Sequence, residues 1–370
     1  MRILYIGNFD PRETGGTLRA FEIVKRVRKH GVDPLVLNIK SVHRDVLTRI
    51  GALYSIKVIS TISRGIDEVK AQAPDLVVST SESPETVIPA YNIAKKLGVP
   101  WTTIMQLPIK LKYTPASTEP ILIDPLWLPQ MLMVLNLLRR TTVLSVSLSC
   151  IVESSVKIPR FYIIKPGVGI DYERYVAGRN VDKVYDALFM ARLTPEKGVF
   201  DVVKVWSRVV KNIPDAKLAV AGRFKNDKIR RRFFRLVTEY GLEKNITYLG
   251  YLTEDEKIEV LKKSRLFLYP SKLDALPIVI LEALASGLPV VAYDIPAIRY
   301  NYPLKCVIRV PVGRTEIMAA KVVEIVKDYD YWNNLASKEN SEYVKNHTWD
   351  NVVRAEVLAY SKIMKEVKSS

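Results

Sequence analysis

The sequence is poor in the residues that build disulfide frameworks and metal sites. Among its 370 residues are two cysteines, Cys150 and Cys306, too few for a disulfide framework, and three scattered histidines that do not suit a structural zinc site. Long hydrophobic runs are also missing. The densest apolar stretch, residues 125–138, is too short and too interrupted by Pro129 and Gln130 to span a bilayer. With 48% hydrophobic and 26% charged residues, the composition argues against a disordered chain and a polytopic membrane protein.

The N-terminal residues lack a secretion signal as well. The opening MRILYIGNF runs directly into a strand-like apolar alternation, with no succession of basic region, apolar region and cleavage site. We therefore expect a cytoplasmic protein. Three glutamines against 56 lysines and arginines resemble the composition of proteins from thermophiles.

The apolar stretch 125–138 leaves two interpretations open. It can form a helix packed on the N-terminal sheet, which is the interpretation that we favour. Alternatively it lies at a membrane interface, with Trp127 among the lipid headgroups and Arg139 and Arg140 on anionic phosphates. On the second interpretation the protein would be peripheral on the inner membrane face.

Positive charge is in excess throughout the chain. The net charge is 56 − 39 = +17, of which residues 1–170 carry +9 and residues 171–370 carry +8. The densest basic cluster consists of Lys217, Arg223, Lys225, Lys228, Arg230, Arg231, Arg232 and Arg235. This charge suits nucleotides, phosphorylated substrates or an anionic membrane surface, although a solvated helix face explains each single residue equally well. No nucleic-acid-binding motif accompanies it, so we expect no nucleic-acid partner.

Strand-like and helix-like segments alternate along the chain. Residues 3–6 predict a buried strand, and residues 17–29 predict a helix with its apolar side chains on one side. A second series of the same kind begins near Tyr185. Between the two series, residues 163–169 contain one proline and two glycines, which is typical of a linker. The pattern predicts the α/β class, with two doubly wound domains that bind ligands at the carboxyl ends of their strands.

The strongest local signal lies in residues 270–291. The pattern predicts a strand, a polar loop, a helix that Pro277 opens, and a second strand. A helix N-terminus at this place favours a diphosphate. Asp274, just before the helix, can accept hydrogen bonds from sugar hydroxyls, and Glu282 within it can accept from a ribose diol. The alternatives are an N-cap carboxylate for Asp274 and a structural ion pair for Glu282.

Two cations follow another predicted strand. Arg192 comes at its carboxyl end, and Lys197 stands at the entrance of the next helix. Cations that converge on one point suit the charge that develops on a departing diphosphate. Either residue alone would be unremarkable on a protein surface.

Together these residues resemble family 4 of the glycosyltransferases, retaining enzymes of the GT-B architecture. The resemblance extends over nearly the whole chain. It rests on Gly15-Gly16, on Lys165 to Asp171, on Arg192 with Lys197-Gly198, on Ala221-Gly222, on Asn245 to Gly250, on Trp349, and on Asp274 and Glu282, which reproduce the family's spacing of two acids eight residues apart.

The resemblance implies two Rossmann-like domains that face each other across a deep cleft. Residues 1–167 would form the acceptor side, rejoined by a C-terminal helix at 350–370, and residues 168–349 the donor side. Implied catalytic residues are Arg192, Lys197 and Asp274. Implied donor contacts are Gly16, Arg192, Lys197, Gly222, Tyr251, Asp274, Ala275, Leu276, Pro277 and Glu282, and implied acceptor-side residues are Gly15, Gly16, Arg19 and Gln106.

The function that follows is a retaining hexosyltransferase. It would use a nucleotide-diphosphate sugar and a glycan or lipid-linked acceptor, with no metal and no cofactor. Two departures keep other functions open: Asp274-Ala275 replaces the family's usual Glu-Gly, and Gln106 stands where a histidine is common. The alternatives are an epimerase of the same fold, or a weakly active subunit that binds a sugar nucleotide or a lipid phosphate.

Overall fold

The computed structural model describes residues 1–39, 57–59, 62–109, 128–178 and 181–369, and these form two compact units. Unit 1 consists of the described residues up to Gly169 together with those from Thr348 onward. Unit 2 consists of Ile170–His347. The chain therefore passes from one unit to the other after Gly169 and returns after His347, where the sequence led us to expect boundaries after residues 167 and 349.

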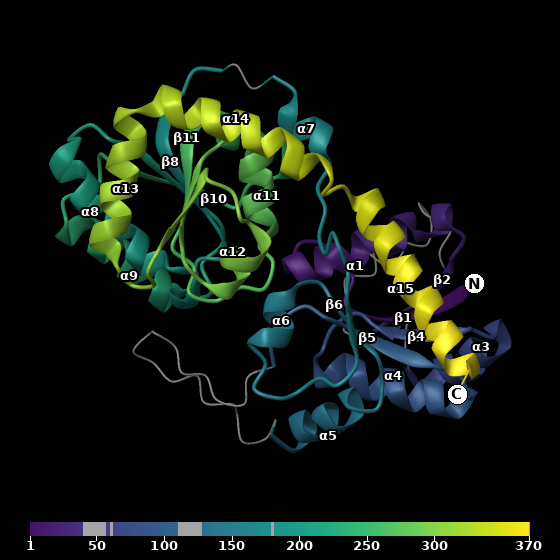
Figure 1. Ribbon diagram of the computed structural model, residues 1–370. Helices are drawn as coiled ribbons and strands as arrows, with labels where there is room; N and C mark the ends of the chain where they lie inside the picture. The colour runs from purple at the N-terminus through teal and green to yellow at the C-terminus, as the bar shows by residue number, and fades with distance from the viewer. Residues whose placement is uncertain (40–56, 60–61, 110–127, 179–180, 370) are drawn as a thin grey trace. The chain divides into compact units, whose positions relative to one another are not determined.

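Unit 1 contains a parallel sheet in the order β3-β2-β1-β4-β5-β6-β7 (Figure 1). Its strands are β1 (Arg2–Gly7), β2 (Asp33–Asn38), β3 (Lys57–Ile59), β4 (Leu76–Ser79), β5 (Trp101–Met105), β6 (Val143–Ser145) and β7 (Phe161–Ile163). Its helices are α1 (Gly15–Arg26), η1 (Val27–His30), α3 (Ile62–Gln72), α4 (Pro84–Leu97), α5 (Leu128–Leu138), α6 (Leu148–Val152) and α15 (Trp349–Ser369).

Unit 2 repeats the same winding in the order β10-β9-β8-β11-β12-β13. Its strands are β8 (Tyr185–Met190), β9 (Leu218–Ala221), β10 (Ile246–Gly250), β11 (Ser264–Tyr269), β12 (Val290–Tyr293) and β13 (Val307–Val310). Its helices are α7 (Tyr172–Val176), η3 (Pro195–Lys197), α8 (Val199–Asn212), α9 (Asp227–Glu239), α10 (Glu254–Lys262), α11 (Ile278–Ala285), α12 (Pro296–Asn301), α13 (Thr315–Lys327) and α14 (Tyr329–Lys345).

The strand order fixes where each unit can bind a ligand. In both units the chain winds outward in two directions from a central pair, β1 and β4 in unit 1 and β8 and β11 in unit 2. The loops that follow the two central strands diverge, so they leave a crevice at the carboxyl ends. The predicted site residues follow these strands.

Apolar strands and one-sided helices explain the layers. Every described strand pair is parallel, and the inner strands of unit 2, β8, β9, β11 and β12, are almost continuously buried, as expected for a sheet covered on both faces. In unit 2, α8 packs against α13 and α9 on one side of the sheet, while α11 packs against α14 and α7 on the other (Figure 1).

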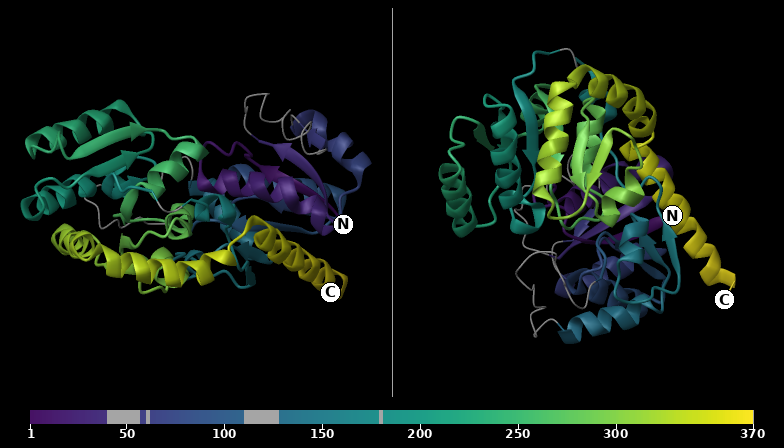
Figure 2. Two further views of the ribbon diagram at one scale, coloured as in Figure 1. Left: turned by 90° about the horizontal axis from the view of Figure 1, so that it is seen from above. Right: turned by 60° about the vertical axis from the view of Figure 1, so that its left-hand side comes forward.

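The C-terminal helix α15 returns to unit 1 and packs against α1 and η1, which the two views of Figure 2 also show. Its first residue lies against Gly169, where a Cβ atom would come within 2.5 Å of the Trp349 backbone nitrogen. Gly169 is therefore required by close approach of two backbones.

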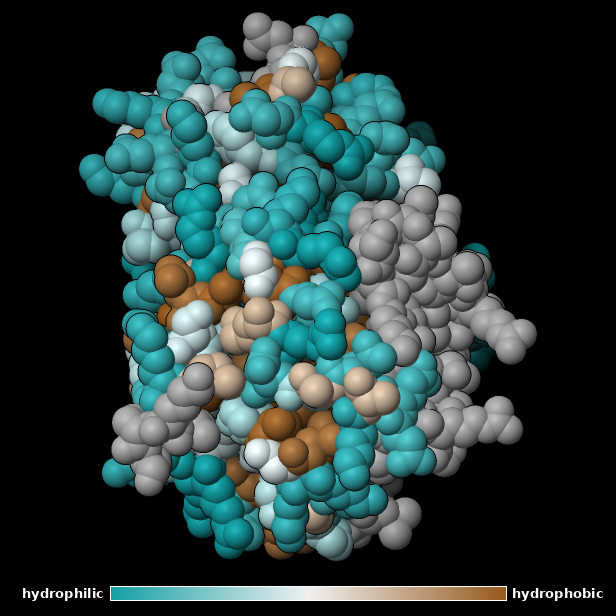
Figure 3. Space-filling model, turned by 90° about the vertical axis from the view of Figure 1, so that its right-hand side faces the viewer, coloured by the Kyte–Doolittle hydropathy of each residue, from teal (hydrophilic) through white to brown (hydrophobic). Residues whose placement is uncertain are grey.

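Helix α5 has a buried side and an exposed side, as far as the described residues extend. Val134, Leu135 and Leu138 are buried against unit 1, whereas Leu132 and Met133 are 53% and 41% exposed. Trp127 lies outside the described residues. Hydrophilic side chains cover most of the face in Figure 3, with hydrophobic ones in small groups between them. Within the described part of the chain, none of the helices has the length and apolar character needed to cross a membrane.

Candidate functional site

The loop after β8 is brought against the end of β11 by a glycine. Gly198 has a φ of 82°, in the left-handed region, and a Cβ atom there would meet the carbonyl oxygen of Pro270 at 2.1 Å. Only glycine therefore fits this position. The result is that Lys197 reaches the loop that carries Asp274.

Lys197 and Asp274 form an ion pair at the carboxyl ends of β8 and β11. The Lys197 Nζ lies 2.5 Å from Asp274 Oδ2 and donates to the Leu273 carbonyl oxygen at 3.0 Å. The Tyr269 hydroxyl donates to the same Asp274 Oδ2, and the Ala275 backbone N–H donates to Oδ1 at 2.9 Å. The two charged side chains are 14% and 16% exposed, so both remain in reach of a ligand.

The surroundings keep Asp274 ionised. Burial would raise the pKa of its carboxyl, but the charge of Lys197 and the hydrogen bonds from Lys197, Tyr269 and Ala275 outweigh burial and lower that pKa. Asp274 is therefore an anion that is bonded to two side chains, Lys197 and Tyr269.

Helix α11 supplies the N-terminal amides that the sequence predicts beside this pair. Pro277 is its N-cap and Ile278 its first residue, one position later than expected. The loop before it is anchored because the Tyr302 hydroxyl donates to the Pro277 carbonyl at 2.8 Å and Asn301 donates to the Ala275 carbonyl at 3.1 Å. Leu276 lies within this anchored loop.

Three other predicted donor residues lie at strand ends on the same edge of unit 2. Arg192 is exposed just after β8. Gly222 follows β9 with a φ of 131°, and a Cβ atom there would meet the Ala191 carbonyl oxygen at 1.8 Å. Tyr251 follows β10, is 49% exposed, and carries the Arg223 guanidinium 4.2 Å from its ring centroid.

Glu282 is paired with a cation that the sequence analysis did not single out. Its Oε1 lies 2.5 Å from the Nζ of Lys257, which also lies 2.8 Å from Glu254 Oε2. This is the structural ion pair that we considered as the alternative. The Glu282 side chain is 5% exposed, and its second oxygen, Oε2, has no hydrogen-bond partner. Lys257 could have been noticed from its spacing of three residues after Glu254 on one helix.

In unit 1, Gly16 and Gln106 meet at the carboxyl edge of the sheet. The Gln106 Nε2 donates to the Thr80 carbonyl at 2.6 Å and to the Gly16 carbonyl at 3.4 Å. A Cβ atom on Gly16 would lie 2.4 Å from Gln106 Oε1, so a side chain there would displace the glutamine. Gly15 and Gly16 begin α1, whose N-cap is Thr14.

Glu82 joins this group without having been predicted. Its carboxylate accepts the Gln106 backbone N–H at 2.8 Å. Burial raises the pKa of the Glu82 carboxyl, although hydrogen bonds from backbone N–H groups oppose the rise. A carboxylate directly after a central strand, β4, could have been considered from the sequence.

Arg19 is a correction to the predicted acceptor side. Its guanidinium is 2% exposed and donates to Glu356 Oε2 at 2.5 Å and to the Gly167 carbonyl at 2.7 Å. Glu356 also accepts from the Tyr360 hydroxyl. The arginine therefore fastens α1 to α15 inside unit 1 and is not available to an acceptor. Its place on the apolar-patterned helix did not reveal this partner, which lies 337 residues away.

The comparisons with known proteins identify the region that contains most of the residues predicted on the donor side. Residues 175–340 match the family described as glycosyl transferases group 1. This region belongs to the group 1 glycosyltransferases. It includes Arg192, Lys197, Asp274 and Glu282, together with their partners Tyr269 and Lys257.

Similar proteins agree with this identification. An uncharacterized glycosyltransferase of Methanocaldococcus jannaschii is 23% identical over 52% of this chain and 48% of its own length. A phosphatidyl-myo-inositol mannosyltransferase of Mycolicibacterium smegmatis is 26% identical over 46% of this chain and 43% of its own length. The chain thus spans less than half the length of these curated relatives.

The fold extends over the whole chain. The crystal structure of Anabaena Alr3699/HepE in complex with UDP and glucose has a TM-score of 0.76 at 15% identity, covering 98% of this chain and 100% of that one. This likeness shows that the group 1 region and unit 1 together have the GT-B fold that the sequence predicted.

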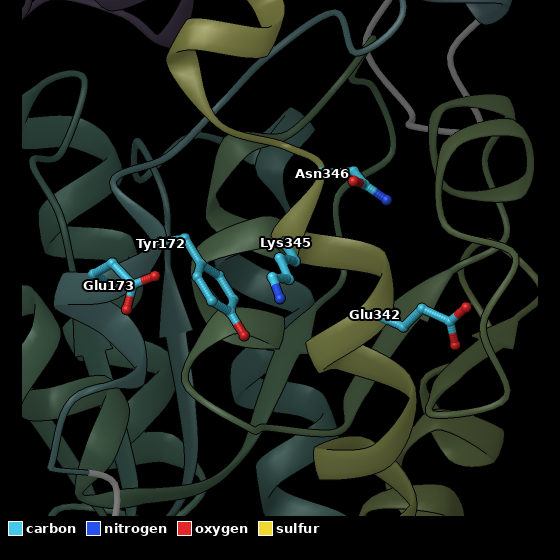
Figure 4. Close-up of a pocket in the computed structure, with 5 residues that line it drawn as sticks. All are labelled: Tyr172, Glu173, Glu342, Lys345 and Asn346. Atoms are coloured by element: carbon cyan, nitrogen blue, oxygen red, sulfur yellow. The ribbon is translucent and has the colours of Figure 1, made fainter.

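A separate pocket of unit 2 contains none of the predicted residues. Tyr172, Glu173, Glu342, Lys345 and Asn346 line an open hollow of about 470 Å³ between α7 and the end of α14 (Figure 4). In the close-up, Tyr172 and Lys345 approach each other, while Glu173 and Glu342 point away to opposite sides. The five side chains do not converge on one point, so we assign this pocket no part in the candidate site.

Proposed function

We propose that this protein is a retaining glycosyltransferase that moves a hexosyl group from a nucleotide-diphosphate sugar to an acceptor hydroxyl. The observation that carries the proposal is the Lys197–Asp274 pair at the divergence of β8 and β11, directly before the N-terminus of α11. It brings together a cation for phosphate, an anion for a sugar, and the backbone amides at the N-terminus of α11.

The donor would be held through its charges. An ammonium group has three N–H donors, and the Leu273 carbonyl and Asp274 account for two of those on Lys197. The third can reach a phosphate oxygen. Exposed Arg192 and the first amides of α11 would add further donors to the same diphosphate. The Oε2 of Glu282 offers an acceptor for a ribose hydroxyl.

The reaction would follow from this arrangement. As the bond between the sugar and the diphosphate breaks, negative charge grows on the phosphate, where Lys197 and Arg192 stabilise it. The departing phosphate oxygen takes the proton of the acceptor hydroxyl, which attacks from the same face, so the configuration is retained. Asp274 stays ionised and offers its charge to the positive sugar ring.

We also propose that the reaction needs no metal ion and no cofactor, because lysine, arginine and helix amides supply the charge that a metal would supply. Activity should therefore survive EDTA. Loss of activity with EDTA and its return with magnesium or manganese would contradict this part of the proposal.

For the acceptor we propose a glycan or a lipid-linked hydroxyl compound at the cytoplasmic face of an anionic membrane. The name of the mycobacterial relative, phosphatidyl-myo-inositol mannosyltransferase, supports a lipid acceptor. The exposed apolar side chains of α5, followed by Arg139 and Arg140, support contact with a membrane.

A second candidate is a weakly active subunit that binds a sugar nucleotide. The observation in its favour is that Asp274, shorter by one methylene than the usual glutamate, is already bonded to Lys197 and Tyr269. Turnover distinguishes the two functions, since a binding subunit would bind the sugar nucleotide without consuming it. We find no comparable observation that favours an epimerase.

Thermal melting with a panel of nucleotides tests the proposal. UDP, GDP and ADP and their glucose and mannose derivatives are added to the full chain. A ligand at 100 times its Kd stabilises the folded state by about 2.7 kcal/mol, so the correct nucleotide should raise Tm clearly. Arg192→Ala should weaken the effect, and Arg208→Ala, an exposed arginine on α8, should not. If none of the nucleotides raises Tm, the proposed donor site is wrong.

A further inference from the structure

Lys257 lies between two carboxylates on the α11 side of unit 2. Its Nζ is 2.5 Å from Glu282 Oε1 and 2.8 Å from Glu254 Oε2, and it stands 5.7 Å from the centroid of the Tyr175 ring. The lysine side chain is only 15% exposed. A cation so enclosed is held in one place by its partners, unlike a surface lysine.

The surrounding groups favour the charged form of Lys257. Burial lowers the pKa of the ammonium group, but the charges of Glu282 and Glu254 and the hydrogen bonds to them outweigh burial and raise it. The Tyr175 hydroxyl donates to Glu254 Oε1 at 2.5 Å. Burial and the nearby charges of Glu282 and Glu254 raise the pKa of this hydroxyl, so it remains a neutral donor.

Among these residues, the Glu282 carboxylate is the one that depends most on the positive charge of Lys257. It is a carboxylate within the apolar helix α11, where an unpaired charge would be costly. Lys257 occupies one of its oxygens, while Oε2 is buried and has no hydrogen-bond partner. A buried acceptor atom without a hydrogen bond destabilises the folded protein, and a hydroxyl donor bound to Oε2 would remove that destabilisation.

We propose that Lys257 is a positioning residue, which fixes the Glu282 carboxylate through Oε1 so that Oε2 receives a ribose hydroxyl of the donor nucleotide. This inference rests on the proposed function. Lys257 itself does not touch the substrate on this account. Its effect is confined to ligands that carry a ribose, whereas Lys197 acts on the phosphates of every ligand.

Isothermal titration of the full chain with two probes tests the inference. One probe is the tightest binder among UDP, GDP and ADP, and the other is inorganic pyrophosphate, which has phosphates but no ribose. For Lys257→Met we expect the Kd of the nucleoside diphosphate to rise by about 10- to 100-fold, the loss of one hydrogen bond to a charged group. The Kd of pyrophosphate should stay the same.

Three further variants control for structural damage. Lys257→Arg keeps a cation and should restore most of the nucleoside diphosphate affinity. Glu254→Gln keeps the Lys257–Glu282 pair and turns only the longer contact of Lys257 into one with a neutral amide oxygen, so it should bind both probes as the wild type does. Lys263→Met removes an exposed ion pair with Glu259 at the end of α10, the helix that carries Lys257, and should leave the affinity for both probes unchanged. Melting curves show whether each variant is folded.

Each outcome supports or overturns the inference. A folded Lys257→Met variant that binds the nucleoside diphosphate with unchanged Kd overturns it, as does an equal loss for pyrophosphate. If Lys257→Met does not fold, two of the other variants decide. The inference is supported if Glu254→Gln binds the nucleoside diphosphate with wild-type affinity and Lys257→Arg binds it with partial affinity. It is contradicted if Glu254→Gln loses affinity for the nucleoside diphosphate. A wild type that binds pyrophosphate but no nucleoside diphosphate refutes the proposed function itself, and the inference with it.

Discussion

Arg192 and Lys197 are both cations that follow β8, yet their surroundings differ. Arg192 is exposed, whereas Lys197 neutralises the nearly buried Asp274. We expect alanine at either position to lower turnover by about 10²- to 10³-fold, the effect of one lost electrostatic contact in a transition state. Lys197→Ala should in addition lower Tm, because Asp274 would lose its counter-charge, while Arg192→Ala should leave Tm nearly unchanged. Steady-state kinetics with melting curves check this, and near-normal turnover of either variant would remove the site assignment.

Asp274 should make stability depend on pH in the acidic range. Its folded-state pKa is depressed because Lys197, Tyr269 and Ala275 outweigh the effect of burial. The stabilisation is therefore fully present above the pKa of an unfolded aspartate, about 3.9, and is lost as the pH falls through the lower folded-state value. Asp274→Asn should be less stable than the wild type at pH 7, and the difference should shrink below about pH 4. Urea unfolding at pH 7, 4 and 3 measures it, and a difference that does not change with pH would contradict the assignment.

At the scale of elements, α15 is held to unit 1 by a buried ion pair. Arg19 and Glu356 are each 2% exposed and lie 2.5 Å apart. Glu356→Gln leaves the arginine without its counter-charge, so we expect a loss of about 3–5 kcal/mol in the free energy of unfolding. Asp350→Asn, on the same helix, affects a carboxylate that is 59% exposed and 3.8 Å from His30, and should change stability by less than about 1 kcal/mol. Denaturant unfolding measures the free energy of unfolding of both variants. Equal losses would show that the buried pair stabilises the protein no more than the exposed one.

The sequence predicts the elements better than their partners. The alternation of apolar strands and one-sided helices was sufficient to expect two doubly wound domains, because each element shows its own periodicity. The same reasoning placed Lys197 at the entrance of a helix and Asp274 in the loop just before another helix, each after a predicted strand. It did not predict that Gly198 permits their contact, because that depends on a carbonyl of another loop. Arg19 and Glu282 also find their partners through tertiary packing, which no local pattern displays.

At the scale of the whole molecule, the two units share one winding but differ in what their central loops carry. In unit 2 the loops after β8 and β11 provide paired charges, a cation and an anion. In unit 1 the loop after β1 provides backbone glycines, the loop after β4 the Glu82 carboxylate and the loop after the neighbouring β5 the Gln106 amide. Charged phosphates suit the first set and neutral hydroxyls suit the second, which supports the assignment of the donor to unit 2.

The positive charge and the exposed side of α5 lead to a prediction about membranes. Leu128, Leu132 and Met133 are 44%, 53% and 41% exposed, and Arg139 and Arg140 follow the helix. Each basic residue near an anionic leaflet contributes about 1 kcal/mol, so this face should give reversible binding that salt weakens. Inserted leucine and methionine side chains would add a part that resists salt. We therefore expect the protein to sediment with phosphatidylglycerol vesicles at low salt, and less with phosphatidylcholine vesicles.

Two variants locate the contact. Leu132→Ser with Met133→Ser should abolish the salt-resistant part of the sedimentation while the melting curve stays near that of the wild type, because neither side chain is buried. Leu358→Ser removes an equally exposed leucine from α15 and should sediment as the wild type does. If the wild type does not sediment with anionic vesicles at low salt, the exposed side of α5 is not a membrane surface. A hydroxyl acceptor in free solution then becomes the better assignment, and the donor site in unit 2 is unaffected.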